Sequence, residues 1–227
     1  MSPAPSGPAE TIGILGAGKS GVAVARRALA AGYRVLLATS RPAARTAFVT
    51  RILAPGAGAA DAAGLLDQAD VVLLAVPLRR WRQLPLDRLA GKVVVDLMNY
   101  WPPADGDLPE FEDANRSSSE VVRDGLPPTA RLVKTLNHIG YHEIEELARP
   151  AGAPDRVALA VAGDDPDAVA EVARLVDDLG FDPVVLDTLA AGAALQPGTA
   201  VFGADLDAAT LRAALTRSPQ PTTTVAR

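Results

Sequence analysis

Short apolar runs and helical patterns alternate along almost the whole chain. The runs are rich in Val, Leu and Ala and show little polar alternation, which predicts strands that are buried on both faces of a parallel sheet. We expect these strands at Thr11–Leu15, Tyr33–Ala38, Val71–Val76, Lys92–Leu97, Arg131–Leu136, Arg156–Ala162 and Asp182–Leu186, with a weaker one near Ala57–Ala60.

Helical patterns lie between these strands, as a chain of βαβ units requires. Helices are expected over Ser20–Ala31, Pro42–Leu53, Ala62–Gln68, Ser117–Asp124, Glu143–Ala148, Pro166–Leu179 and Leu206–Leu215. Gly32 is expected to cap the first helix, and Pro42 lies in the first turn of the second. The segment Met98–Arg116 is rich in proline and acidic residues, which predicts a long loop.

This order of elements predicts an α/β fold, namely a doubly wound, mostly parallel Rossmann sheet with a C-terminal βαβ extension. We expect one domain over residues 10–217, with its core at 10–140 and the extension at 141–217. The polar stretches 1–9 and 218–227 are expected to be flexible tails.

Charge and composition exclude several classes of protein. The net charge of -5 argues against nucleic acid as a partner, because phosphates favour a basic surface. The chain has no cysteine, which excludes disulfides and thiolate metal sites. It contains neither a run of about 18 apolar residues nor a signal-peptide pattern, so we expect a cytoplasmic protein without a membrane partner.

A glycine motif follows the first strand. Gly16, Gly18 and Gly21 form Gly-x-Gly-x-x-Gly, which opens an Ala/Val-rich helix and precedes a second strand, as in dinucleotide-binding folds. In such a loop the glycines allow a tight turn, close approach of the pyrophosphate and close helix packing. With Ala17, Lys19 and Ser20 the motif predicts a pyrophosphate site at the positive end of the helix.

The same segment also matches Gly-x4-Gly-Lys-Ser, counted from Gly13, which is the pattern of a nucleotide-hydrolysing P-loop. A P-loop begins after its strand, whereas Gly13 lies inside the apolar run, and no acidic strand end suited to Mg²⁺ is evident. The dinucleotide interpretation is therefore favoured over a P-loop and over a glycine-rich turn without a ligand.

The end of the second strand indicates which dinucleotide is bound. NAD sites place Asp or Glu there for the ribose 2′-hydroxyl, but this chain has Thr39, Ser40 and Arg41, with Arg45 one helical turn later. Hydroxyls and guanidinium groups suit the 2′-phosphate of NADP(H). The alternative is that Ser40 caps the next helix and the arginines are solvated.

Several segments together resemble the coenzyme F-420 (F420)-dependent NADP oxidoreductases and their uncharacterised relatives. They are Gly16–Gly21, Thr39–Arg41, Leu74–Pro77, Val94–Tyr100, Ser117–Glu120, Val133–His138 and Val161–Asp165. The resemblance implies that the Val-Pro segment (Ala75, Val76, Pro77) and the Asn segments (Asn99, Asn137) line the nicotinamide cleft, where a deazaflavin stacks on the nicotinamide. Ala17, the long acidic loop and the His after Asn137 depart from the family pattern and place this chain among the relatives.

The chemistry of the cleft depends on the acceptor. Hydride transfer to a deazaflavin or flavin needs ring stacking but no side-chain acid. A carbonyl or imine acceptor needs a proton donor, and His138 beside Asn137 is the candidate; the alternative is a loop histidine that hydrogen-bonds the backbone. His138 and His142 lack the spacing of a zinc peptidase, so no metal is expected.

Two charged runs have open interpretations. Arg79, Arg80 and Arg82, around Trp81, could attract an anionic coenzyme or form a solvated face anchored by Trp81. The acidic loop Asp105–Asp113 is either simply solvated or overhangs the cleft, where it would repel the phosphate and carboxylates of the F420 tail.

The residues thus predict an NADPH-binding oxidoreductase that transfers hydride between NADP(H) and a deazaflavin (F420) or flavin-like acceptor. The alternatives are an NADPH-dependent reductase of a small carbonyl or imine, and a non-catalytic NADP(H)-binding sensor. The expected partner is a small-molecule hydride acceptor or donor, and a homodimer is left open.

Overall fold

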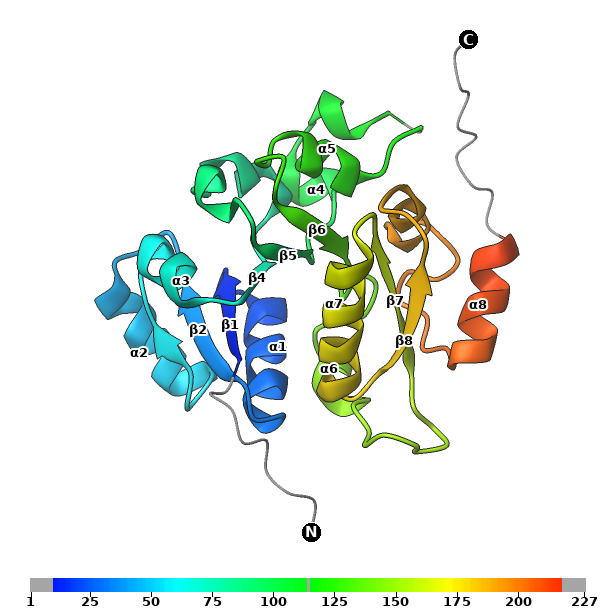
Figure 1. The fold of residues 1–227 in the computed structure, drawn as a ribbon, viewed down its shortest axis with the longest axis horizontal. Helices are drawn as coiled ribbons and strands as arrows, with labels where there is room; N and C mark the ends of the chain where they lie inside the picture. Colours follow the sequence, from blue (N-terminus) through cyan, green and yellow to red (C-terminus); the bar gives the residue numbers. More distant parts are fainter. Residues whose placement is uncertain (1–9, 114, 218–227) are drawn as a thin grey trace.

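One sheet contains all the strands of the described residues, which are 10–113 and 115–217 of this computed structural model. The strands are β1 Thr11–Leu15, β2 Arg34–Ala38, β3 Gly58–Ala59, β4 Val71–Leu74, β5 Val93–Asp96, β6 Arg131–Lys134, β7 Ala158–Gly163 and β8 Asp182–Leu186. Their order in the sheet is β3-β2-β1-β4-β5-β6-β7-β8 (Figure 1). The segments 1–9 and 218–227, predicted as tails, lie outside the described residues.

Helices cover both faces of this sheet (Figure 1). The α-helices are α1 Lys19–Ala30, α2 Ala43–Leu53, α3 Ala62–Gln68, α4 Pro102–Asp105, α5 Ser118–Asp124, α6 Glu143–Glu146, α7 Pro166–Leu179 and α8 Ala208–Arg217. Short 3-10 helices are η1 Leu78–Gln83, η2 Leu86–Leu89, η3 Pro109–Phe111 and η4 Ala190–Leu195. Within the described part of the chain, no helix is both long and apolar enough to cross a membrane.

Strand direction confirms the predicted doubly wound sheet. Strands β1 to β6 pair in parallel, so their carboxyl ends meet at one edge. Strand β7 runs antiparallel to β6 through a short ladder, and β8 is parallel to β7. The C-terminal β7-α7-β8 unit therefore extends the sheet as predicted, but with its direction reversed.

Burial on both faces explains the continuous apolar strands. In β5, Val93 and Val95 pack with α1 and α7, whereas Val94 points to the other face and packs with α3 and Trp81. Because each strand supplies side chains to two cores, no polar alternation is possible in its centre.

Several element ends differ from the sequence prediction, and local contacts explain them. The predicted loop Met98–Arg116 contains two short helical turns, α4 and η3. The last helix begins at Ala208 instead of Leu206, because the Asp207 carboxylate accepts the N–H of Thr210 at 2.8 Å and caps it. The predicted helix Glu143–Ala148 is only the single turn α6, which packs against α1.

A buried arginine ties the extension together. The Arg156 guanidinium is 2.6 Å from Asp177 Oδ1 at the end of α7 and 2.7 Å from Asp182 Oδ1 at the start of β8. Its side chain is almost completely buried, and this pairing compensates for the loss of hydration. Arg156 is thus a structural residue of the extension.

Candidate active site

The loop between β1 and α1 has the geometry that the glycine motif predicts. Gly16 has φ +123°, and a Cβ there would lie 2.2 Å from the Ala75 carbonyl oxygen. A Cβ at Gly21 would lie 2.1 Å from the Gly16 carbonyl oxygen. Both positions therefore require glycine, the first for the turn and the second for close packing of α1.

Gly18 has a different environment. It precedes the first residue of α1 with φ -77°, a value that any residue adopts, and a Cβ there would meet no atom within 4 Å. No side chain caps the helix, so the first-turn N–H groups of α1 lack a side-chain acceptor. Open space beside unpaired N–H groups at a helix N-terminus suits an anionic group such as a pyrophosphate.

Gly13 lies in the middle of β1, as the sequence indicated. A Cβ there would come within 2.5 Å of Leu65 Cδ2 and 2.7 Å of the Ala69 Cβ in the core. The glycine is thus a packing position within the strand, and the P-loop alternative has no geometric support.

A cavity of about 290 Å³, here called the cofactor cavity, adjoins the loop. Its lining includes Gly16, Ala17, Gly18, Thr39, Ser40, Ala75, Val76 and Pro77 among the predicted residues. Lys19, Ser20, Gly21, Arg41, Arg45 and Asn99 were predicted with them but do not line it. Arg80 and Gln83 of η1 complete one wall, so Arg80 is the residue of the basic run that faces this cavity. Trp81 is buried, which agrees with its predicted role as the packing anchor of this run.

The end of β2 presents hydroxyls and free guanidinium groups. The Thr39 and Thr46 hydroxyls are 2.8 Å apart, and Thr39 Oγ1 accepts the backbone N–H of Arg41 at 3.1 Å. The exposed guanidinium groups of Arg41 and Arg45 make no hydrogen bond or ion pair with the described residues. Ser40 does not cap α2, because the N-cap position is Pro42 and no side chain caps that helix.

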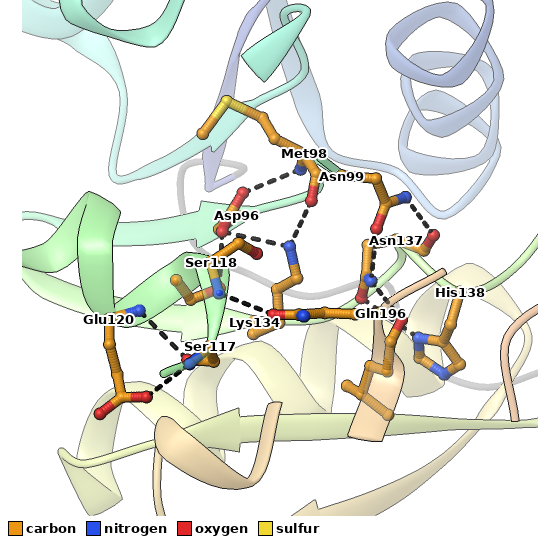
Figure 2. Close-up of polar contacts among 12 residues, drawn as sticks. Asp96, Met98, Asn99, Ser117, Ser118, Glu120, Lys134, Asn137, His138 and Gln196 are labelled. Atoms are coloured by element: carbon orange, nitrogen blue, oxygen red, sulfur yellow. Dashed lines mark hydrogen bonds and ion pairs between the residues drawn. The ribbon is translucent and has the colours of Figure 1, made fainter. Parts of the chain in front are cut away.

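At the carboxyl edge, the two predicted asparagines contact each other (Figure 2). Asn137 Nδ2 donates to Asn99 Oδ1 at 3.0 Å and to the Leu195 carbonyl at 2.7 Å. Asn99 Nδ2 in turn donates to the Asn137 carbonyl at 2.7 Å. These bonds join the segments that follow β5, β6 and η4, and they fix the half-exposed Asn99 side chain at this edge.

His138 is buried, and its ring nitrogens are used inside the protein. Nε2 accepts the backbone N–H of Ala160 in β7 at 3.1 Å, which leaves the proton on Nδ1, 3.4 Å from Asn137 Oδ1. Burial, reinforced by the charge of Lys134, lowers the pKa of His138 to about 3. This geometry favours a neutral His138 that hydrogen-bonds the backbone over a His138 that donates a proton to a substrate.

The His138 environment predicts a pH-dependent stability. Because the folded imidazole stays neutral while the unfolded one protonates below about pH 6.5, the unfolded state binds more protons, and stability falls as pH drops toward 3. Near pH 5 the neutral His138 lowers the free energy of unfolding by about 2 kcal/mol. His138→Gln should remove this part of the slope in urea titrations between pH 5 and 7, and His142→Gln on the surface should not. Identical slopes for wild type and His138→Gln would contradict the burial.

A buried ion pair lies beside the asparagines (Figure 2). Lys134 Nζ is 3.2 Å from Asp96 Oδ2 and also donates to the Met98 carbonyl. The carboxylate accepts the Ser119 hydroxyl at 2.7 Å and the Met98 N–H at 2.8 Å. Burial lowers the pKa of Lys134, and the charge of Asp96 opposes this shift. This pair was not predicted, although charged residues at the ends of two buried strands are a visible signal in the sequence.

The backbone is strained at the carboxyl edge of the sheet, just beyond β6. Leu136, two residues beyond β6, has φ +61°, the one positive φ among the described non-glycine residues. The buried hydroxyls of Ser118 and Thr135 have no hydrogen-bond partner there. Strained backbone and unsatisfied polar groups persist where the surrounding structure imposes them, and they cluster at functional sites.

Tyr141 was missed by the sequence analysis. Lys19 Nζ, at the start of α1, donates to the Tyr141 hydroxyl at 2.9 Å and lies 4.7 Å from the centre of its ring. The loop after β6 therefore reaches back over the N-terminus of α1. Contact across 122 residues leaves no local pattern by which it could have been predicted.

The acidic loop is anchored by one of its own carboxylates. Buried Asp105 accepts the backbone N–H of Arg79 at 3.1 Å and that of Trp101 at 3.0 Å. The other acids, Asp107, Glu110, Glu112 and Asp113, are exposed. Among the described residues, no three His, Cys, Asp or Glu side chains are grouped so as to hold a metal ion.

Comparison with known proteins agrees with this geometry. The family described as "NADP oxidoreductase coenzyme F420-dependent" matches residues 11–100. The crystal structure of hypothetical protein SMa0349 from Sinorhizobium meliloti is 33% identical, with a TM-score of 0.70, over 87% of this chain and 95% of that one. An Arthrobacter sp. FB24 structure, assigned as an F420-dependent NADP reductase, is 25% identical, with a TM-score of 0.69, over 86% of this chain and 98% of its own.

A shorter match is to protein YjhV of Escherichia coli (strain K12), which is 45% identical over 62 residues. That match spans 27% of this chain and 45% of the length of YjhV. The profile match falls on the cofactor half of the sheet, and the Sinorhizobium and Arthrobacter structures extend the likeness over most of the chain. The chain belongs to the family of coenzyme F420-dependent NADP oxidoreductases.

Proposed function

We propose that this protein is an NADPH-dependent oxidoreductase, which passes hydride between NADP(H) and a second compound at the carboxyl edge of β4, β5 and β6. The observation that carries the proposal is the cofactor cavity, which places the open Gly18 position and the hydroxyl-bearing end of β2 in one site. Its volume of about 290 Å³ accommodates part of a dinucleotide, and the rest would extend toward Asn99.

NADP(H) is supported over NAD(H) by the end of β2. A carboxylate at this position would bind a ribose 2′-hydroxyl and repel a 2′-phosphate, but the residues present are Thr39, Ser40 and Arg41. The free guanidinium groups of Arg41 and Arg45 match the oxygens of a phosphate in charge and in geometry.

Arg41→Ala is therefore expected to weaken NADPH binding by about 1.5–3 kcal/mol and to leave NADH binding almost unchanged. Isothermal titration calorimetry with both cofactors measures the difference. Arg51→Ala is the matched control, because Arg51 is an exposed arginine of α2 that lies over the Phe48 ring. Equal losses for NADPH and NADH would contradict the assignment of Arg41 to the 2′-phosphate.

The protein's own residues would act in binding and orientation. The α1 N-terminus would hold the pyrophosphate, and Val76, Pro77 and Asn99 would flank the nicotinamide, which supplies the hydride when NADPH is bound. The Asn99–Asn137 hydrogen bonds hold this edge rigid, and a fixed geometry is what hydride transfer between two stacked partners requires.

The family favours F420 or a flavin as the second compound, and a small carbonyl or imine is the alternative. Because the His138 imidazole is buried and bonded to Ala160, it does not support a role as the proton donor to a carbonyl. Stopped-flow NADPH oxidation with F420, FMN and small carbonyls, for wild type and His138→Gln, tests these possibilities. We expect only mild rate changes in the variant.

If His138→Gln reduced a carbonyl about 100-fold more slowly than the wild type, His138 would act as a general acid. Tight NADPH binding without turnover of any acceptor would favour a non-catalytic sensor.

A further inference from the structure

A second cavity, here called the ring pocket, adjoins the asparagine pair. It has a volume of about 370 Å³ and is lined by Tyr100, Trp101, Pro102, Phe111, Gln196 and Pro197. Tyr100 directly follows Asn99, and Gln196 directly follows Leu195, whose carbonyl accepts from Asn137 at 2.7 Å. The pocket thus begins one residue beyond Asn99 and one residue beyond the Leu195 carbonyl that holds Asn137, next to the proposed nicotinamide position.

Aromatic rings form the walls of the ring pocket, and the Tyr100 ring is held in place. Tyr100 and Phe111 have ring centres 5.8 Å apart. The Tyr100 hydroxyl accepts the Leu108 N–H at 3.0 Å and donates to the Gly106 carbonyl at 3.3 Å, which fixes its ring against the loop. Trp101 is 52% exposed, so its indole face is available to a ligand. Such a surface suits stacking of a flat ring.

One polar side chain of the ring pocket, Gln196, has a donor that the described part of the protein does not use. Gln196 Oε1 accepts the backbone N–H of Ser118 at 2.6 Å, which determines which end of the amide is oxygen (Figure 2). Its Nε2 makes no hydrogen bond with any described residue, and Gln196 lines the pocket. The free N–H group can therefore donate to a carbonyl oxygen of a bound molecule.

Charge in and around the ring pocket disfavours an anion. The lining contains no Lys, Arg, Asp or Glu. Phe111 lies between exposed Glu110 and Glu112, on the loop that also carries Asp107. Glu110 lines a separate pocket together with Arg82 and Arg116, so the ring pocket disfavours an anion because its own lining offers no charge that could pair with one. A phosphate- and carboxylate-bearing tail such as that of F420 has no cationic partner among the lining residues.

We propose that the ring pocket holds the hydride acceptor, and that this acceptor is an uncharged flat ring bearing a carbonyl oxygen, such as a quinone. The proposal rests on the NADPH-dependent function above and names the substrate class of the same site. A quinone would take one hydride from NADPH and one proton from solvent. Its two C=O bonds become C–OH as the ring turns aromatic, and the NADPH is oxidised to NADP⁺.

The test compares a neutral naphthoquinone with an anionic one and with two anionic coenzymes. NADPH oxidation is followed with menadione and with a naphthoquinone sulfonate, each corrected for the reaction without protein, and with F420 and FMN. We expect KM for menadione to be at least about tenfold lower than for the sulfonate, since the uncharged lining offers the anion no cationic partner. F420 and FMN should react more slowly than menadione at equal concentration.

Two variants then test the walls and the donor. Gln196→Glu keeps an oxygen for the Ser118 N–H but loses the donor, and Trp101→Ala removes a stacking face. Each should raise KM for menadione about tenfold and leave NADPH affinity unchanged. Trp101→Phe keeps an aromatic face, so its KM for menadione should stay close to that of the wild type. Phe48→Ala, an exposed aromatic on α2, is the control without effect.

The outcomes separate the two proposals. A protein that does not bind NADPH refutes the proposed function itself. A protein that binds NADPH but prefers F420, FMN or the sulfonate overturns the inference alone. So does one that reduces neither quinone, or whose KM for menadione is unchanged in both Gln196→Glu and Trp101→Ala.

Discussion

Gly18→Val is expected to weaken NADPH binding at least about 100-fold while the protein remains folded. The backbone at Gly18 has φ -77°, which valine also adopts, and the new Cβ would meet no protein atom within 4 Å. The side chain would instead occupy the space proposed for the pyrophosphate at the start of α1. Calorimetric titration with NADPH measures the loss, and circular dichroism confirms the fold.

Gly21→Val is the contrasting variant in the same motif. Its Cβ would lie 2.1 Å from the Gly16 carbonyl oxygen, so we expect it to lower the melting temperature and to lose the fold along with the cofactor. Undiminished NADPH affinity in a folded Gly18→Val protein would show that the loop has a structural role only.

Lys134→Met is expected to lower the free energy of unfolding by about 3 kcal/mol. The substitution keeps an unbranched side chain under η4 but leaves the fully buried Asp96 carboxylate without its cation. It also removes the donor to the Met98 carbonyl, in the segment that leads to Asn99. Urea unfolding followed by circular dichroism measures the change.

Arg88→Met provides the control for this charge removal. Arg88 pairs with Asp67 on the surface, where both side chains are at least 39% exposed, and such pairs contribute about 0–1 kcal/mol. If Lys134→Met unfolded at the same urea concentration as Arg88→Met, the Asp96–Lys134 pair would not be the buried anchor described here.

Most of the sheet could be predicted because its signals are local. The glycine motif lies within six residues of the end of β1, so its pattern can be recognised without knowing that Gly16 packs against the Ala75 carbonyl beyond β4. The hydroxyls and arginines that support NADP(H) directly follow β2. Strands buried on both faces are continuous apolar runs, which can be recognised directly in a sequence.

Details of the carboxyl edge could not be predicted, because they depend on segments distant in the chain. His138 bonds Ala160 across 22 residues, and Lys134 pairs with Asp96 across 38. Only the folded sheet shows that the His138 ring is turned into the interior. This burial favours a neutral imidazole that bonds the backbone of β7 over the candidate acid that the sequence suggests.

The sequence by itself determined the Rossmann order of elements, the glycine loop after β1 and the basic end of β2, because each depends on residues close together along the chain. The tertiary structure alone decided the reversed direction of β7, the burial of His138 and Lys134, and the ring pocket formed between the loop 100–111 and residues 196–198. The physical reason is that strand direction and burial depend on contacts across long sequence separations, and no local pattern encodes these contacts.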